Sequence, residues 1–223
     1  MLTILTDTEV RVLGCLVEKQ VTTPEYYPLT LNVLTLACNQ KNNRQPVTSL
    51  HENAVLAAVE SLREKNLVYI FYGSNSRVPK YKHVMPEILH LSQAKLAIMC
   101  VLMLRGPQTV GELRERGSRL YEFSGLEEAE DTLNSLITKD KDNEPLVARL
   151  PRQSGQKEAR FAHLLGGELD LEALAEIELQ QHAAASKHSP ADRCAQLEQQ
   201  VDTLTEQMKS LREEFAEFKK QFD

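Results

Sequence analysis

A helix that leads directly into a two-stranded hairpin is the clearest pattern in the first half of the chain. Val55, Val59 and Leu62 recur at helical spacing and form one apolar stripe. Residues 67–72 follow, rich in β-branched and aromatic side chains, and a Gly-Ser-Asn-Ser turn returns the chain through residues 80–85. This order is typical of the second half of a winged helix-turn-helix domain.

Four short sequences of the form Ser/Thr-x-x-Glu predict where helices begin. In such a capping box the hydroxyl and the carboxylate each accept a hydrogen bond from a backbone amide that the helix leaves unpaired. The first box predicts a helix that ends near Gln20. The pairs are Thr6 with Glu9, Ser49 with Glu52, Thr109 with Glu112, and Ser124 with Glu127.

A second helix is predicted between the first one and the Ser49 helix. It is expected to begin at Pro28, because proline suits the first position of a helix, and to end near Gln40. A polar loop, residues 39–46, separates it from the next helix. The first domain, residues 1–88, is therefore predicted as helix, helix, loop, helix and hairpin.

The same order of patterns recurs in residues 89–167. An apolar helix over residues 92–105 is ended by Gly-Pro, a short helix ends near Gly117, and a third helix precedes two β-rich segments. We therefore predict a mainly α fold with small β-hairpins (α+β), built as two tandem winged helix-turn-helix domains. The corresponding positions are Val55, Val59 and Leu62 with Ala129, Leu133 and Leu136, and Leu67-Val68 with Leu146-Val147.

The tail carries the most regular pattern in the chain. We predict a connecting helix and linker over residues 168–189 and a coiled-coil helix over residues 190–223, where apolar residues alternate three and four positions apart. Such a helix needs a partner surface. That partner is a second copy of the chain, giving a homodimer, or alternatively a winged domain of the same chain. The residues expected at the dimer interface are Leu197, Val201, Leu204, Met208, Leu211, Phe215, Phe218 and Phe222.

The formal net charge of −6 is concentrated in the tail. Residues 1–90 carry nine Lys/Arg against eight Asp/Glu, residues 91–165 carry eleven of each, and residues 166–223 carry six against thirteen. Many nucleic-acid-binding domains are markedly basic. The near-neutral charge of the first 165 residues therefore argues against a strong electrostatic hold on DNA.

Other features of the composition favour a cytoplasmic location. The four cysteines lie far apart without a Cys-x-x-Cys pair, which fits reduced thiols better than a disulfide or metal framework. The longest apolar run, residues 96–104, is about half the length of a membrane span. The N-terminus lacks the basic region and cleavage site of a signal peptide. We expect no association with a membrane.

A set of short motifs near the N-terminus is long and specific: Glu9-x-Arg-Val-Leu-Gly14, Glu18-Lys19, Thr22-Thr-Pro24, Tyr27-Pro-Leu-Thr-Leu-Asn32, Ala37-Cys-Asn-Gln-Lys41, Asn43-Arg44 and Pro46-Val47. With these motifs the chain resembles the YceH-like family of uncharacterised bacterial proteins. The similarity covers about residues 1–165, and the tail matches in character only. The resemblance implies a tandem winged-helix fold in a cytoplasmic bacterial protein and supplies no activity.

The third helix of a winged domain is the usual reader of DNA bases, and it needs Arg, Lys, Asn or Gln on its outward face. In the first domain only Asn53 on that face can read bases, and Glu60 and Glu64 would face phosphates. We do not expect the second domain to enter a major groove. The outward faces are expected to carry Asn53, Ala57, Glu60, Ser61 and Glu64, and Glu127, Asp131, Asn134, Ser135 and Thr138.

Cations in the loops and hairpins are better candidates for nucleic-acid contacts. They would bind phosphates, which adds salt-sensitive affinity without sequence information. The alternative is that the hairpin charges keep exposed strand edges soluble. With Asn53, the candidates are Lys41, Arg44, Arg77, Lys80, Lys82, Arg149, Arg152, Lys157 and Arg160.

Other polar groups are interpreted as structural. The asparagines of residues 39–43 are expected to tie down the turn after the second helix rather than act in catalysis. Tyr26, Tyr27 and Pro28 are expected to pack as a corner, and His51 to lie on the surface. The six histidines lack metal-ligand spacing, and no common catalytic motif occurs. We predict no cofactor, no metal and no enzymatic activity.

Two functional hypotheses follow. The first is a DNA-binding, regulator-like dimer that contacts the DNA backbone through its first domain and its hairpins. The second is a scaffold that binds another protein and not DNA. This hypothesis is suggested by the carboxylates on both third helices together with the coiled-coil tail.

Overall fold

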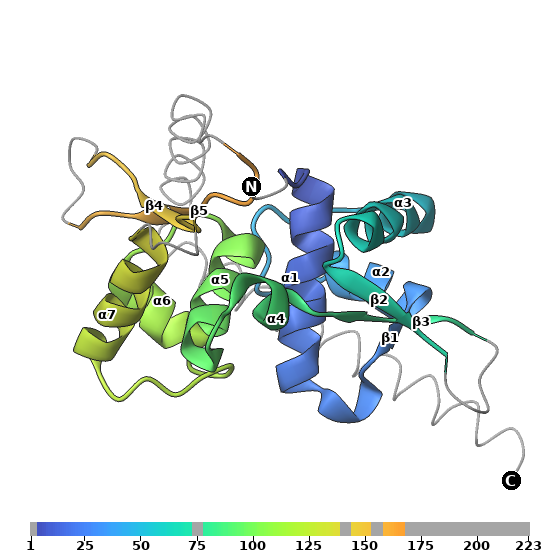
Figure 1. Cartoon of the computed structure of the whole chain (residues 1–223), viewed down its shortest axis with the longest axis horizontal. Helices are drawn as coiled ribbons and strands as arrows, with labels where there is room; N and C mark the ends of the chain where they lie inside the picture. The colour runs from blue at the N-terminus through green and yellow to red at the C-terminus, as the bar shows by residue number, and fades with distance from the viewer. Residues whose placement is uncertain (1–3, 73–77, 139–143, 153–157, 168–223) are drawn as a thin grey trace, which may run out of the picture. The chain divides into compact units, whose positions relative to one another are not determined.

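The first half of the chain places three helices against a three-stranded antiparallel sheet, as Figure 1 shows. The strands lie in the order β1-β3-β2, so the strand between α1 and α2 pairs with the last strand of the hairpin. A 3-10 turn, Pro24–Tyr26, follows α1, and a short helix, α4 Met85–Leu89, follows β3. The elements are α1 Asp7–Thr22, β1 Leu29–Thr30, α2 Leu31–Cys38, α3 Glu52–Glu64, β2 Val68–Phe71 and β3 Lys80–His83.

The second half repeats this order with a two-stranded sheet. An isolated bridge between Gln108 and Phe161 takes the place of the first strand. The elements are α5 Gln93–Arg105, α6 Val110–Gly117, α7 Leu126–Ile137, β4 Val147–Arg149 and β5 Phe161–His163.

The two halves share their strand register as well as their order. In each half the residue before a capping threonine pairs with an aromatic residue of the last strand. Two positions after that aromatic residue, the same strand carries a histidine that lies opposite a valine. The halves are therefore a structural repeat. The equivalent pairs are Leu29–Tyr81 and Gln108–Phe161, Val68–His83 and Val147–His163, and the capping residues Thr30 and Thr109.

This computed structural model describes residues 4–72, 78–138, 144–152 and 158–167. The chain divides into a compact unit, Met1–Leu169, and a second unit, Asp170–Asp223. The predicted connecting helix, the coiled coil and its eight interface residues lie outside the described residues. The described part is mixed α/β, with seven α-helices and small antiparallel sheets.

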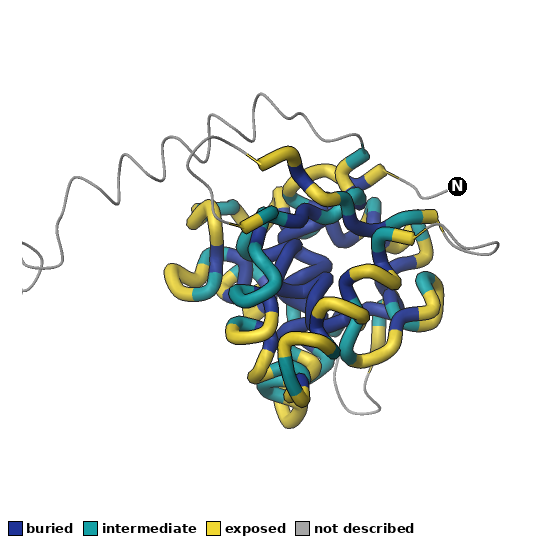
Figure 2. Tube along the Cα trace, turned by 90° about the vertical axis from the view of Figure 1, so that its left-hand side faces the viewer, coloured by how far each residue is buried: buried dark blue, intermediate teal, exposed yellow. Residues whose placement is uncertain are grey.

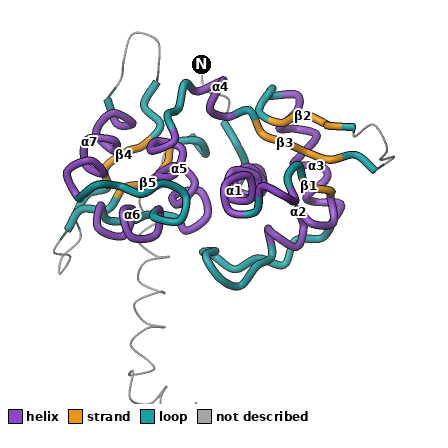
Figure 3. The backbone as a smooth tube through the Cα atoms, turned by 90° about the horizontal axis from the view of Figure 1, so that it is seen from below, coloured by secondary structure: helices purple, strands orange, loops and turns teal. Residues whose placement is uncertain are grey.

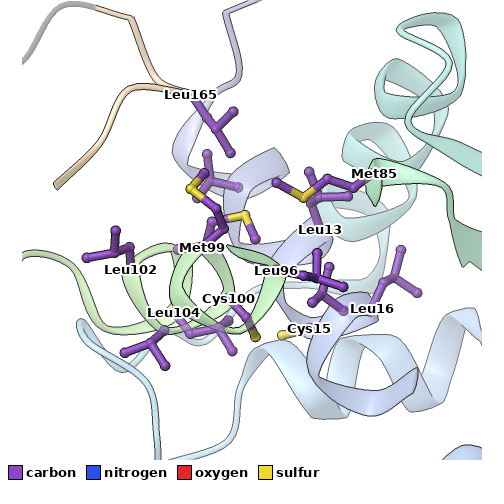
Figure 4. Close-up of a cluster of buried hydrophobic side chains, with 14 of the residues drawn as sticks. Leu13, Cys15, Leu16, Met85, Leu96, Met99, Cys100, Leu102, Leu104 and Leu165 are labelled. Carbon is purple, nitrogen blue, oxygen red and sulfur yellow. The ribbon is translucent and has the colours of Figure 1, made fainter. Parts of the chain in front are cut away.

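The equivalent first helices of the two halves, α1 and α5, pack against each other in the centre of the compact unit. Figures 1 and 3 both place this pair between the two hairpins. Leu13 and Leu16 of α1 lie in one buried cluster with Leu96 and Met99 of α5 (Figure 4). Figure 2 shows buried positions gathered in the interior and exposed ones around it. The halves therefore share a continuous core.

Gly14 allows α1 and α5 to come close. A Cβ at this position would lie 2.9 Å from Cδ2 of Leu104 and 3.2 Å from Cβ of Met103. The backbone carbonyl of Gly14 accepts a hydrogen bond from the thiol of Cys100, at 3.6 Å. A side chain at position 14 would therefore push the helices apart.

Two of the four predicted capping boxes are confirmed. At α1 the backbone amide of Thr6 donates to the Glu9 carboxylate at 2.6 Å, and the amide of Glu9 donates to the Thr6 hydroxyl at 3.3 Å. Thr109 and Glu112 make the same reciprocal bonds at α6, at 3.0 and 3.3 Å. Each box satisfies two amides that the first helical turn leaves unpaired.

The box predicted at Ser49 and Glu52 is wrong. His51 is the N-cap of α3 and makes no side-chain cap bond. The preceding backbone is instead tied to the end of α2, because the Asn39 side chain accepts from the Leu50 amide at 2.7 Å and donates to the Leu50 carbonyl at 2.8 Å. Because both backbone groups of Leu50 bond to Asn39, Leu50 does not join the helix, which begins at Glu52.

The box predicted at Ser124 and Glu127 is also wrong, by one residue. Gly125 is the N-cap of α7, without a side-chain cap bond. The carboxylate of Glu128 accepts from the backbone amide and the hydroxyl of Ser124, at 2.6 and 2.8 Å. A glutamate one position later thus satisfies the free amide.

The second helix begins at Leu31 and not at the expected Pro28. Leu29 and Thr30 form β1, which the sequence did not predict. They are extended because they pair with β3, which provides partners for their backbone groups. Thr30 then caps α2, which ends at Cys38. The helix α4 was not predicted either, and the boundary expected between residues 88 and 89 falls at its last residue.

Candidate nucleic-acid interface

Lys80 and Lys82 lie on the outward face of the three-stranded sheet. They alternate along β3 with Tyr81 and His83, which are buried against the core. Lys82 is exposed and Lys80 is half-buried. Arg77, the third candidate of this hairpin, lies outside the described residues.

The expected outward face of α3 is confirmed. Asn53, Ala57, Glu60 and Glu64 are exposed, and Ser61 is half-buried. The opposite face carries the buried apolar side chains of the helix. Asn53 is thus accessible, but it lies on a surface that also carries two carboxylates.

The outward face of α7 is also as expected, and it is acidic. The helix carries four carboxylates and no Lys or Arg along its whole length. A phosphate backbone would be repelled by this face. All five expected side chains are exposed, namely Glu127, Asp131, Asn134, Ser135 and Thr138, and Leu126 and Glu130 are exposed as well.

Arg44 is not the exposed loop cation that we expected. Its side chain is 0% exposed and forms two bonds with Glu18 of α1, at 2.5 Å from Nη2 and 3.1 Å from Nη1. Its Nε donates to the Ala37 carbonyl at 3.1 Å. The guanidinium therefore has no access to a phosphate. Lys41, in the same loop, is exposed.

The second hairpin presents two exposed candidates, Arg149 and Arg152. Arg160 is half-buried and engaged, because it donates to the Pro107 carbonyl at 2.8 Å and pairs with Glu112 at 3.4 Å. Lys157 lies outside the described residues. Figure 3 shows the two hairpins on either side of the central helices.

A polar junction joins the loop after α2 to the ends of α5 and α6. Glu18 accepts from both Arg44 and Arg119. The loop amide of Gln45 donates to the Leu104 carbonyl at 2.8 Å. Six polar side chains form this junction: Arg11, Glu18, Asn43, Arg44, Arg105 and Arg119.

The charges of the junction are mutually dependent. Burial would raise the pKa of Glu18, but the hydrogen bonds and charge of Arg44, with the charge of Arg119, hold that pKa below its usual range. Burial lowers the pKa of Arg105, and the positive charges of Arg116 and Arg119 lower it further. Arginines outnumber carboxylates here, so positive charge gathers beside the loop.

Sequence reasoning missed Arg105, Arg116 and Arg119. Their side chains come from the last turn of α5 and from the end of α6 and the loop after it, and nothing local in the sequence marks them as neighbours. Arg116 pairs with Glu112 at 3.1 Å, and its side chain is 32% exposed. Arg119 is 40% exposed. Arg116 and Arg119 are thus partly exposed cations, and Arg119 shares the Glu18 carboxylate with Arg44, which lies in the same loop as Lys41.

The asparagines after α2 have the expected structural role. Asn39 holds Leu50, and Asn43 accepts a hydrogen bond from Arg105. The expected packed corner is correct for Tyr27, whose hydroxyl accepts from the His83 amide at 2.8 Å. It is wrong for Tyr26, which is 70% exposed.

Two histidines occupy equivalent positions in the two sheets, where His83 is buried and His163 is half-buried. Burial lowers the pKa of His83 to about 4, with a smaller effect from Lys82. Burial also lowers the pKa of His163 to about 4, against a small opposing effect of Asp7. Both ring nitrogens of His83 and Nδ1 of His163 lack a hydrogen-bond partner in the structure. His51 is exposed.

No group of three His, Cys, Asp or Glu side chains among the described residues could hold a metal ion. No described helix has the length and apolarity that crossing a bilayer requires. Cys15, Cys38 and Cys100 are buried and form no disulfide.

The described residues define a mixed α/β protein whose two halves repeat one order of elements. The family model of the protein of unknown function DUF480 matches residues 5–156, and the chain belongs to this family. It is 47% identical to a UPF0502 protein of Pelobacter propionicus and 48% identical to one of Geobacter sulfurreducens, over 99% of both chains in each case. A UPF0502 protein of Vibrio atlanticus is 44% identical over 95% of this chain and 97% of the relative. The expected membership of an uncharacterised bacterial family is thus confirmed.

Proposed function

We propose that the compact unit is a tandem pair of winged helix-turn-helix modules and that it binds duplex DNA through the phosphate backbone. The order α1-β1-α2-α3-β2-β3, with β1 paired to β3, supports this proposal because it matches the order of elements expected of a winged helix. The second half repeats it with a single bridge in place of β1. This repeat is the observation that carries the proposal.

The contacts proposed are with phosphates and not with base edges. α3 offers Asn53 beside exposed carboxylates, and α7 offers no cation, so neither helix suits a major groove. Exposed and half-buried cations lie instead on the hairpins and around the loop after α2. Those proposed as phosphate contacts are Lys41, Lys80, Lys82, Arg116, Arg119, Arg149 and Arg152.

Charge reversal on the sheet tests this proposal. Lys82→Glu should weaken binding of duplex DNA. The slope of log affinity against log salt concentration should become shallower by about the amount that one phosphate contact contributes. Lys95→Glu, which makes the same change of charge on the first turn of α5, is the matched control and should leave binding unchanged. Fluorescence anisotropy at low and moderate salt measures both. Absence of binding at either salt concentration would refute the proposal.

We propose further that the tail makes the protein a homodimer, a role that rests on the heptad pattern of residues 190–223 alone. Leu204→Lys with Leu211→Lys would place charges in the apolar seam. Analytical ultracentrifugation should then show a dimer for the unaltered chain and a monomer for the variant. A dimer in both would mean that the contact lies elsewhere.

A protein-binding scaffold is the second candidate, and the acidic face of α7 favours it. Such a face suits a basic partner protein better than a nucleic acid. Retention of a partner from nuclease-treated extract, lost on Glu127→Gln with Asp131→Asn, would support the scaffold. Partners lost on nuclease treatment alone would support DNA binding.

A further inference from the structure

Aromatic rings and lysines share the outward face of the three-stranded sheet. Tyr69 lies directly opposite Lys82, and Phe71 directly opposite Lys80. Cross-strand partners point to the same face of a sheet, and alternate residues of a strand share that face, on the order of 7 Å apart. The rings of Tyr69 and Phe71 are 49% and 47% exposed. Tyr72, immediately after the strand, is 66% exposed.

The fold itself does not require these rings. In the second half the equivalent of the Tyr69–Lys82 pair is Ala148 opposite Ala162. That hairpin keeps the same antiparallel register with neither an aromatic ring nor a lysine at this pair of positions. Neighbouring exposed apolar side chains that the fold does not require are typical of an interaction surface.

We propose that this face is a stacking platform for the bases of single-stranded nucleic acid. Bases stack on the rings of Tyr69 and Phe71, and phosphates of the same strand pair with the ammonium groups of Lys80 and Lys82. Proteins that bind single strands without sequence preference combine stacking rings with cations in this way. The inference rests on the proposed nucleic-acid binding and names a second, single-stranded ligand for the first sheet.

The arrangement of the charges favours a nucleic acid over an apolar protein segment. Each ring has a lysine beside it on the neighbouring strand. An apolar partner would remove these ammonium groups from water without pairing them, which costs free energy. A nucleic-acid strand offers each lysine a phosphate and each ring a flat base.

The test compares two single strands that differ only in their bases. An oligothymidylate of about 20 nucleotides supplies bases and phosphates, and an abasic strand of equal length supplies the phosphates alone. The full chain should bind the oligothymidylate on the order of ten-fold or more tightly than the abasic strand. Tyr69→Ala with Phe71→Ala should bind both strands equally, and Lys82→Glu should weaken both.

Three controls keep the result specific. Tyr26→Ala removes a ring that is 70% exposed outside the sheet and should change nothing. Tyr69→Phe with Phe71→Tyr keeps both rings and should keep the preference for bases. Thermal melting followed by circular dichroism should show that each variant folds, as expected for side chains that are half exposed.

Each outcome separates this inference from the proposed function. Duplex binding without any preference for the base-bearing strand would overturn the platform and leave duplex binding intact. Preference for that strand without duplex binding would support the platform and refute the proposal that the protein binds duplex DNA. A preference that survives Tyr69→Ala with Phe71→Ala would place the stacking site elsewhere and overturn the inference. Retention of a protein through these rings, with no binding of either strand, would assign the face to a protein partner.

Discussion

Glu18 and Arg44 form an ion pair whose two side chains are 1% and 0% exposed. They lie 26 positions apart in the sequence. Their paired bonds connect α1 to the loop after α2, and Glu18 also accepts from Arg119 in the loop just after α6. One buried carboxylate thus connects the loop of the first half to the second half.

Arg44→Ala should lower the free energy of unfolding by about 3–5 kcal/mol, because it leaves Glu18 buried with only the partly exposed Arg119 as a partner. Urea denaturation measures the change. Arg63→Ala, on the exposed surface of α3, is the control and should stay within about 0.5 kcal/mol. An equally small effect of Arg44→Ala would show that the pair does not stabilise the fold.

Gly14→Ala should destabilise the protein by about 1–3 kcal/mol, because the added methyl group meets Leu104 and Met103 at the helix contact. Helix propensity alone would favour alanine by up to about 1 kcal/mol, so the sign of the change shows which effect dominates. Gly111→Ala in α6 is the matched control, since its nearest heavy atom is 4.0 Å away, and it should stabilise slightly. Thermal melting measures both variants.

The buried His83 should make stability depend on pH. Its pKa is about 4 in the folded protein and 6.5 for the unperturbed group, so the unfolded chain binds a proton first as pH falls. The contribution of His83 to the free energy of unfolding therefore decreases between about pH 6.5 and pH 4, and this contribution changes no further below that range. His163 contributes in the same direction.

His83→Leu should reduce this dependence, because one of the two titrating groups is lost. It should also raise stability at neutral pH by about 1 kcal/mol, since the imidazole nitrogens lack partners. Urea denaturation at about pH 7 and about pH 5 measures the difference. His51→Leu, at an exposed position, should leave the pH dependence as it is. Equal pH dependence in the original chain and the His83 variant would contradict the prediction.

Asn39→Ala should cost about 1–3 kcal/mol, because the backbone amide and carbonyl of Leu50 lose their side-chain partner. Asn134→Ala, on the exposed face of α7, is the control and should be neutral or slightly stabilising. Hydrogen exchange at Leu50 should become faster in the Asn39 variant alone. Unchanged protection there would refute the structural role.

The candidate site was only partly visible in the sequence. The outward faces of α3 and α7 and the lysines of β3 follow from periodicity, and the structure places them as expected. Arg44 could not be placed, because an arginine in a polar loop reads as a surface cation until its partner is known. Arg119 was missed for the same reason, since its neighbour Glu18 is 101 positions away.

The sequence by itself determined the order of helices and hairpins, the repeat of that order and the caps at Thr6 and Thr109. These depend on side chains within a few positions of one another, and local periodicity records them. Only the tertiary structure decided that β1 pairs with β3, that Asn39 delays the start of α3, and that α1 packs closely on α5 through Gly14. Each of these depends on contacts between distant segments, because burial and backbone pairing are satisfied by whichever groups the folded chain brings together.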